Sequence, residues 1–60
     1  MNMILVRRDD PEEIVTLVKW QNWPHGRSGF SGWWGQTATM IANHRTPCMF
    51  LDSVWQLKNN

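Results

Sequence analysis

One stretch, residues 19–36, holds four of the chain's five tryptophans and all four of its glycines, and it limits how the chain can fold. Each glycine favours a turn over the interior of a helix or strand. A tryptophan combines a large apolar ring system with one hydrogen-bond donor, so each must enter a core or meet a partner. We therefore expect a flexible, glycine-rich aromatic loop here. The glycines recur at every third position: Gly26, Gly29, Gly32 and Gly35.

The length of the chain, 60 residues, predicts a single domain over 1–60. A domain of this size buries only about 60% of the surface that its unfolded chain exposes, so heavy side chains must compensate for a small core. Cys48 is the only cysteine, which rules out a disulfide within the chain and favours a reducing, cytoplasmic location. No stretch approaches the roughly 20 apolar residues that span a bilayer, so we expect no membrane partner.

Charge is distributed unevenly although the formal net charge is only +1. Acids cluster in residues 9–13, and the next acid is Asp52, so the middle of the chain is mildly basic. This asymmetry either keeps the fold soluble or forms a phosphate-binding face.

The first elements predicted are a strand over 3–8 and a helix over 11–21. Asp10 can cap the helix, Pro11 suits its first turn, and Glu13 stands at the capping-box distance from Asp10. The alternative is a strand, because residues 14–18 are rich in β-branched side chains. In that interpretation residues 9–13 form a hairpin turn.

Two further strands are predicted after the aromatic loop, over 36–42 and 48–57. The first alternates threonine and isoleucine with alanine and methionine, as expected for a strand with one covered face. The second also fits a helical period, but a hairpin with 36–42 favours the strand. The predicted fold is α+β, a small three-stranded antiparallel sheet with one packed helix.

Interpreted as strands, the first part of the chain resembles the opening of a chromodomain. The resemblance is carried by Ile4-Leu5, Arg8, Leu17-Val18-Lys19-Trp20, Trp23 and Pro24. It implies an alternative fold, an SH3-like or chromodomain-like barrel. It also implies that Trp20 and Trp23 form two walls of an aromatic cage for a methylated lysine, in a reader of methyl-lysine or peptide ligands.

Catalytic and metal chemistry find little support. His44 and Cys48 have a spacing found in zinc sites, and His25 could add a third ligand, but a fourth is missing. A nucleophilic Cys48 would need an oriented base and an oxyanion hole, which so short a chain can rarely hold. We expect a non-enzyme with no cofactor and no metal.

Binding of a partner is the remaining function. Tryptophan and arginine dominate the energetics of protein interfaces. The leading hypothesis is a small protein-interaction module, such as an inhibitor or modulator of a larger machine. Trp20 and Trp55 are expected in the core because they fall on periodic apolar stripes. The predicted partner-binding residues are Trp23, Arg27, Phe30, Trp33 and Trp34.

Two other partners are compatible with the same residues. Aromatic rings stack on unpaired bases while cations neutralise phosphates, so Lys19, Arg27 and Arg45 could serve a single-stranded nucleic-acid binder. A second copy of the chain is a further candidate partner, because a small core with exposed tryptophans could be completed by another copy.

Overall fold

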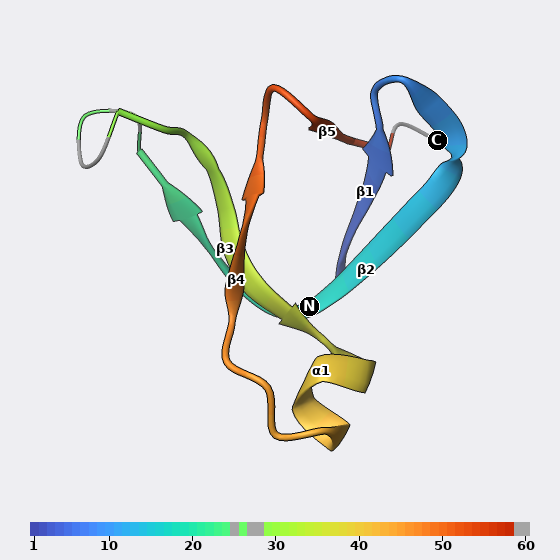
Figure 1. Cartoon of the computed structure of the whole chain (residues 1–60), viewed down its shortest axis with the longest axis vertical. Helices are drawn as coiled ribbons and strands as arrows, with labels where there is room; N and C mark the ends of the chain where they lie inside the picture. Colours follow the sequence, from blue (N-terminus) through green and yellow to red (C-terminus); the bar gives the residue numbers. More distant parts are fainter. Residues whose placement is uncertain (25, 27–28, 59–60) are drawn as a thin grey trace.

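The computed structural model describes residues 1–24, 26 and 29–58, and over these residues the chain forms one curved antiparallel sheet (Figure 1). The strand order is β4-β3-β2-β1-β5. The predicted three-stranded sheet with a packed helix is therefore wrong, and the SH3-like barrel alternative fits better. The elements are β1 Met3–Arg7, β2 Asp10–Trp23, β3 Gly32–Thr37, α1 Ala38–Ala42, β4 Cys48–Leu51 and β5 Trp55–Leu57.

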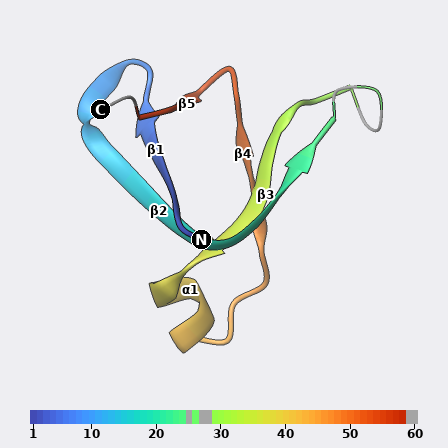
Figure 2. The same cartoon turned by 180° about the vertical axis from the view of Figure 1, so that it is seen from behind.

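The curved sheet forms a half-barrel, and the long strand β2 joins its two parts. Its first part pairs with β1 and its second part with β3, and Leu17 takes part in both ladders, opposite Met3 and opposite Thr37. The register with β3 shifts between Leu17 and Lys19, and such an irregularity bends a strand. Figures 1 and 2 show the result from opposite sides: β1 lies beside the first half of β2 with β5 beyond it, and β3 lies beside the second half with β4 beyond it.

The predicted helix over 11–21 is part of strand β2. The side chain of Asp10 does accept a backbone N–H as a capping residue would, from Glu12 at 3.2 Å. That bond spans two residues, as in an Asx turn, and it shapes the hairpin between β1 and β2. The β-branched residues that follow pack on a pleated surface, where residues 14–16 pair with β1 and the strand continues from Leu17 into its pairing with β3. This pairing is why the strand alternative prevails.

The predicted strand over 36–42 is also wrong beyond its first residues. Strand β3 ends at Thr37, whose hydroxyl accepts the N–H of Met40 at 3.1 Å and so caps the short helix α1. The predicted strand over 48–57 is divided into β4 and β5. At the break, the N–H of Val54 donates to the carbonyl of Leu51 at 3.1 Å, closing a turn.

The core lies on the inner, concave face of the sheet. Leu5 and Leu17 are completely buried, and burying one such side chain contributes roughly 1.5–3 kcal/mol. The rings of Phe50 and Trp55 meet edge to face with centroids 5.9 Å apart, and they belong to the two opposite edge strands. This contact therefore closes the half-barrel across its open side. The buried set is Met3, Leu5, Leu17 and Phe50, with Val15, Trp20, Trp33 and Trp55 packed against it.

Two glycines of the expected loop belong instead to β3, where close packing requires them. A Cβ on Gly35 would collide with the carbonyl of Lys19 and lie 2.9 Å from the Cβ of Trp20, the residue directly opposite. A Cβ on Gly32 would collide with the carbonyl of Phe50. Glycine here allows neighbouring strands to approach rather than loosening the backbone.

Candidate binding surface

Strand β3 places its two adjacent tryptophans on opposite faces of the sheet, because successive side chains of a strand alternate. Trp33 lies opposite Phe50 and faces the core. Trp34 lies opposite Met49 on the outer face, which is the convex side away from the core, and 37% of its surface is exposed. The structure thus assigns the first ring to the interior and leaves the second available to a partner.

Apolar side chains from three strands and the segment before β3 gather around Trp34 on the outer face. They line a hollow of about 370 Å³. The rings of Trp23 and Trp34 are in contact, with centroids 5.8 Å apart and planes tilted by 38°. Phe30 is 59% exposed. We call this set the outer-face cluster: Trp23, Phe30, Trp34, Met49 and Leu51.

Hydrogen bonds fix the chain next to Phe30 against the end of β4. The hydroxyl of Ser31 donates to a carboxylate oxygen of Asp52 at 2.6 Å. The N–H of Asp52 donates to the carbonyl of Ser31 at 3.0 Å. This two-bond clamp holds the backbone beside Phe30 near Leu51, so the hollow is bordered by an anchored segment.

A second hollow, of about 230 Å³, adjoins the cluster and is more polar. Trp34 lines both hollows. Lys19 and Gln36 are paired across β2 and β3 in the second one, and the side-chain amide of Gln36 donates to the carbonyl of Arg45 at 2.8 Å. The outer face therefore changes from apolar to cationic on the two sides of one tryptophan.

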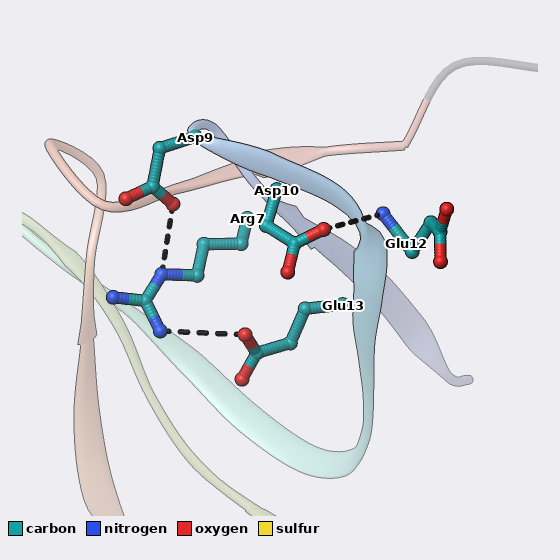
Figure 3. Close-up of polar contacts among 5 residues, drawn as sticks. All are labelled: Arg7, Asp9, Asp10, Glu12 and Glu13. Carbon is teal, nitrogen blue, oxygen red and sulfur yellow. Dashed lines mark hydrogen bonds and ion pairs between the residues drawn. The ribbon is translucent and has the colours of Figure 1, made fainter.

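The acidic residues of the N-terminal half lie at the β1–β2 hairpin, at the other end of β2 from Trp23 (Figure 3). Arg7 forms ion pairs there, with Nε 2.9 Å from Asp9 Oδ1 and Nη1 3.3 Å from Glu13 Oε2. The pKa of Arg7 is raised above its ordinary value, and the negative charge of Asp9 contributes more to this rise than that of Glu13. The carboxylates of Asp9 and Glu13 are thus paired within the hairpin.

The predicted partner-binding residues are only partly brought together. Trp23, Phe30 and Trp34 meet in the outer-face cluster, whereas Trp33 packs against the core. Arg27 lies outside the described residues. Of the predicted nucleic-acid contacts, Lys19 and Arg45 are exposed near the polar hollow.

Met49 and Leu51 complete the cluster, although the sequence interpretation did not propose them as site residues. Their signal was the alternation within 48–57, which placed both on one face of a strand. Only the pairing of β4 with β3 shows that this face is the outer one, since Met49 lies opposite Trp34.

Trp20 and Trp23, the two cage walls implied by the chromodomain resemblance, do not share a face of β2. Trp20 lies opposite Gly35, packs against the core and donates from Nε1 to the carbonyl of Met1 at 3.2 Å. Trp23 belongs to the outer-face cluster. The structure does not bring these two rings together.

Of the three residues considered for metal binding or catalysis, His44 and Cys48 are described, and His25 lies outside the described residues. His44 adopts a positive φ of 55° after α1, and Cys48 is exposed at the start of β4. Within the described residues, three or more His, Cys, Asp or Glu side chains do not gather where they could hold a metal ion. Over the same part of the chain, no helix has the length and apolar character needed to cross a membrane.

Comparison of the chain with protein-family models, curated proteins and solved structures gives no match. The surface must therefore be interpreted from its chemistry. An open hollow lined by aromatic and aliphatic side chains suits a bulky apolar side chain of a partner.

Proposed function

We propose that the chain is a small, non-enzymatic protein-interaction module that binds a protein partner through its outer-face cluster. In this role the chain would inhibit or modulate a larger machine to which the partner belongs. The observation that carries the proposal is the position of the cluster. Trp23, Phe30 and Trp34 line a hollow on the face of the sheet opposite the buried core.

The cluster has the composition of an interaction site. Tryptophan is enriched among the residues that dominate binding energy, and such residues act best in pockets that exclude water on binding. Single exposed apolar residues are ordinary, whereas exposed apolar side chains that share one hollow, as these do, are typical of an interaction site. Folding does not explain it, because the inner face supplies the buried core of the described chain.

Selection from a displayed library of random peptides would test this proposal. We expect enriched peptides to lose binding to the Trp34→Ala and Phe30→Ala variants. They should keep it for Ile14→Ala, which alters a 48% exposed apolar side chain in the other half of the sheet. Each variant would first be shown to unfold cooperatively. Enriched peptides that bind all variants equally would contradict docking at the cluster.

A single-stranded nucleic-acid binder is the second candidate, favoured by one observation. Trp34, a ring on which a base can stack, lines the same hollow as Lys19, which can meet a phosphate. This function predicts binding of labelled oligothymidine that weakens steeply between about 50 and 200 mM salt. Absent or salt-insensitive binding would exclude it.

The cellular setting and oligomeric state belong to the same proposal. An exposed, unpaired Cys48 thiol is compatible with a reducing cytoplasm. Pairing with a second copy would compete for the cluster. Sedimentation of the wild-type chain and Trp34→Ala over a range of concentrations would detect such competition.

A further inference from the structure

The proposed function does not specify the chemistry of the partner. The two adjoining hollows indicate which kinds of side chain the partner would present. Resting on that function, we propose that the outer face binds an extended acidic-apolar peptide segment. A bulky apolar side chain of the partner occupies the outer-face cluster. An acidic side chain two residues away lies against Lys19 in the polar hollow.

The spacing follows from the register of β2 and β3. Trp34 lies opposite Gln21, and Gln36 lies opposite Lys19, so the ring shared by the two hollows is two residues from the cationic position along each strand. An apolar side chain of the partner that packs on the Trp34 ring therefore lies two residues from Lys19, whereas Trp23 on the far wall lies four residues from it. Two residues of strand span about 7 Å. An extended peptide repeats its side-chain direction over the same interval, so alternate residues of the partner match the two hollows.

The sign of the partner's charge follows from the charges on this face. Among the outward-facing residues of the described strands β2 from Lys19 onward, β3 and β4, Lys19 is the only charged one. Asp52, which follows β4 at the opposite side of the cluster from Lys19, accepts a hydrogen bond from the Ser31 hydroxyl. The backbone of Arg45 is held at the same end by its bond from Gln36. Asp9 and Glu13, which could compete for Lys19, are instead paired with Arg7 at the distant hairpin.

Two other ligand chemistries fit less well. A cationic or methylated side chain could be held by cation–π attraction to Trp34, but Lys19 beside the ring would repel it. Nucleic acid binds through many phosphate contacts, and in the described chain this face offers Lys19 with Arg45 nearby. The first hollow is also lined by the flexible aliphatic chains of Met49 and Leu51, which suit a peptide side chain better than a base.

Three fluorescein-labelled synthetic peptides of about nine residues test the proposal by fluorescence anisotropy at low salt. The first carries Leu, Glu, Phe, Glu and Leu at every second position with Ser between them, the second has Lys in place of Glu, and the third keeps Glu but has Ser in place of Leu and Phe. We expect the first to bind about five- to tenfold more tightly than the second, as one attractive contact replaces a repulsive one. The third should not bind measurably.

Charge reversal at Lys19 gives the sharper test. Lys19→Glu should invert the preference, so that the Lys peptide binds more tightly than the Glu peptide. The matched control is Lys58→Glu, which makes the same change of net charge at an exposed residue following β5 and should leave the preference unchanged. Trp34→Ala should weaken both peptides.

The outcomes separate this proposal from the proposed function. If both peptides bind equally and both require Trp34, the acidic specificity is overturned while docking at the cluster stands. If binding is indifferent to Trp34→Ala, both are overturned. The acidic-peptide inference also fails if neither peptide binds at millimolar concentration, if oligothymidine binds more tightly than the Glu peptide, or if a second copy covers Trp34.

Discussion

The two halves of the sheet expose similar fractions of apolar side chain on their outer faces, but they differ in how these side chains are grouped. In the β1–β2 half, Ile4 and Ile14 are 40% and 48% exposed; in the β2–β3–β4 half, Trp34 and Phe30 are 37% and 59% exposed. Ile4 borders a hollow of about 290 Å³, but the lining of that hollow includes the polar residues Asn2 and Lys58. The isoleucines themselves are strand formers whose exposure is ordinary. The aromatic rings instead share one hollow, and Trp34 is in contact with Trp23.

This difference shows that grouping and shape, rather than exposure alone, distinguish an interaction surface from a strand surface. The inner faces of the two halves show no such difference in grouping, because both contribute side chains to one core. Leu5 comes from the first half, Phe50 from the second, and Leu17 from the strand that they share. Substitutions can therefore separate what supports the fold from what supports binding.

The largest effect is expected at the junction of the halves. Leu17→Ala removes a completely buried side chain whose residue pairs with both β1 and β3, and it should cost about 3 to 5 kcal/mol of unfolding free energy. A domain of this length has only roughly 3 to 9 kcal/mol in total. Urea unfolding followed by circular dichroism should show loss of both halves in one transition. Two separate transitions would contradict a shared core.

The adjacent tryptophans of β3 should give opposite results. Trp33→Ala removes part of the core packing and should lower the unfolding free energy by about 2 to 3 kcal/mol, less than for a fully buried ring. Trp34→Ala should lower it by less than about 1 kcal/mol and act on binding instead. Equal losses of stability in the two variants would contradict their assignment to opposite faces.

A smaller effect is expected at Gly35, where strands of the second half approach closely. Gly35→Ala introduces a Cβ that must displace the Lys19 carbonyl or Trp20, at a cost of about 1 to 2 kcal/mol. The control is Gly26→Ala, because a Cβ there meets no atom within 4 Å. A thermal unfolding curve for Gly35→Ala that matches the control would show that β2 and β3 are further apart.

The smallest effect is expected at the exposed hairpin of the first half. Arg7→Gln should lower the melting temperature slightly, and less so in high salt, because its partners Asp9 and Glu13 are exposed. The raised pKa of Arg7 means that its favourable charge is present at every pH below the ordinary pKa of arginine. It is lost only as pH rises through the raised value. The melting temperatures of the wild-type chain and of Arg7→Gln, each measured at low and high salt, test the contribution of these ion pairs.

The sequence predicted some of the candidate site but not its geometry. It singled out Trp23, Phe30 and Trp34, because tryptophan and phenylalanine so close to glycine are unusual. It could not separate Trp33 from Trp34, since the face of each depends on which strand lies opposite. Nor could it show that Met49 completes the cluster, because its pairing with Trp34 links residues 15 positions apart.

The helix prediction over 11–21 shows why local signals were insufficient for the fold. The Asp10 signal was real, but the same carboxylate geometry serves a helix cap and an Asx turn. Residues 11–21 are a strand because β1 pairs with the first part of β2 and β3 pairs with its second part. Strand β3 follows β2 only after the glycine-rich segment. Propensity within a few residues does not contain that information.

The sequence by itself determined the content of the molecule: one short chain, four of its five acids near its start, β-branched strand formers, and rings concentrated around closely spaced glycines. Tertiary structure alone decided that β2 is a strand shared by two halves, that Trp33 supports the core, and that Trp34 faces outward. The physical reason is that the face of a side chain in a sheet is set by register. Register arises from hydrogen bonds and packing between segments distant in sequence.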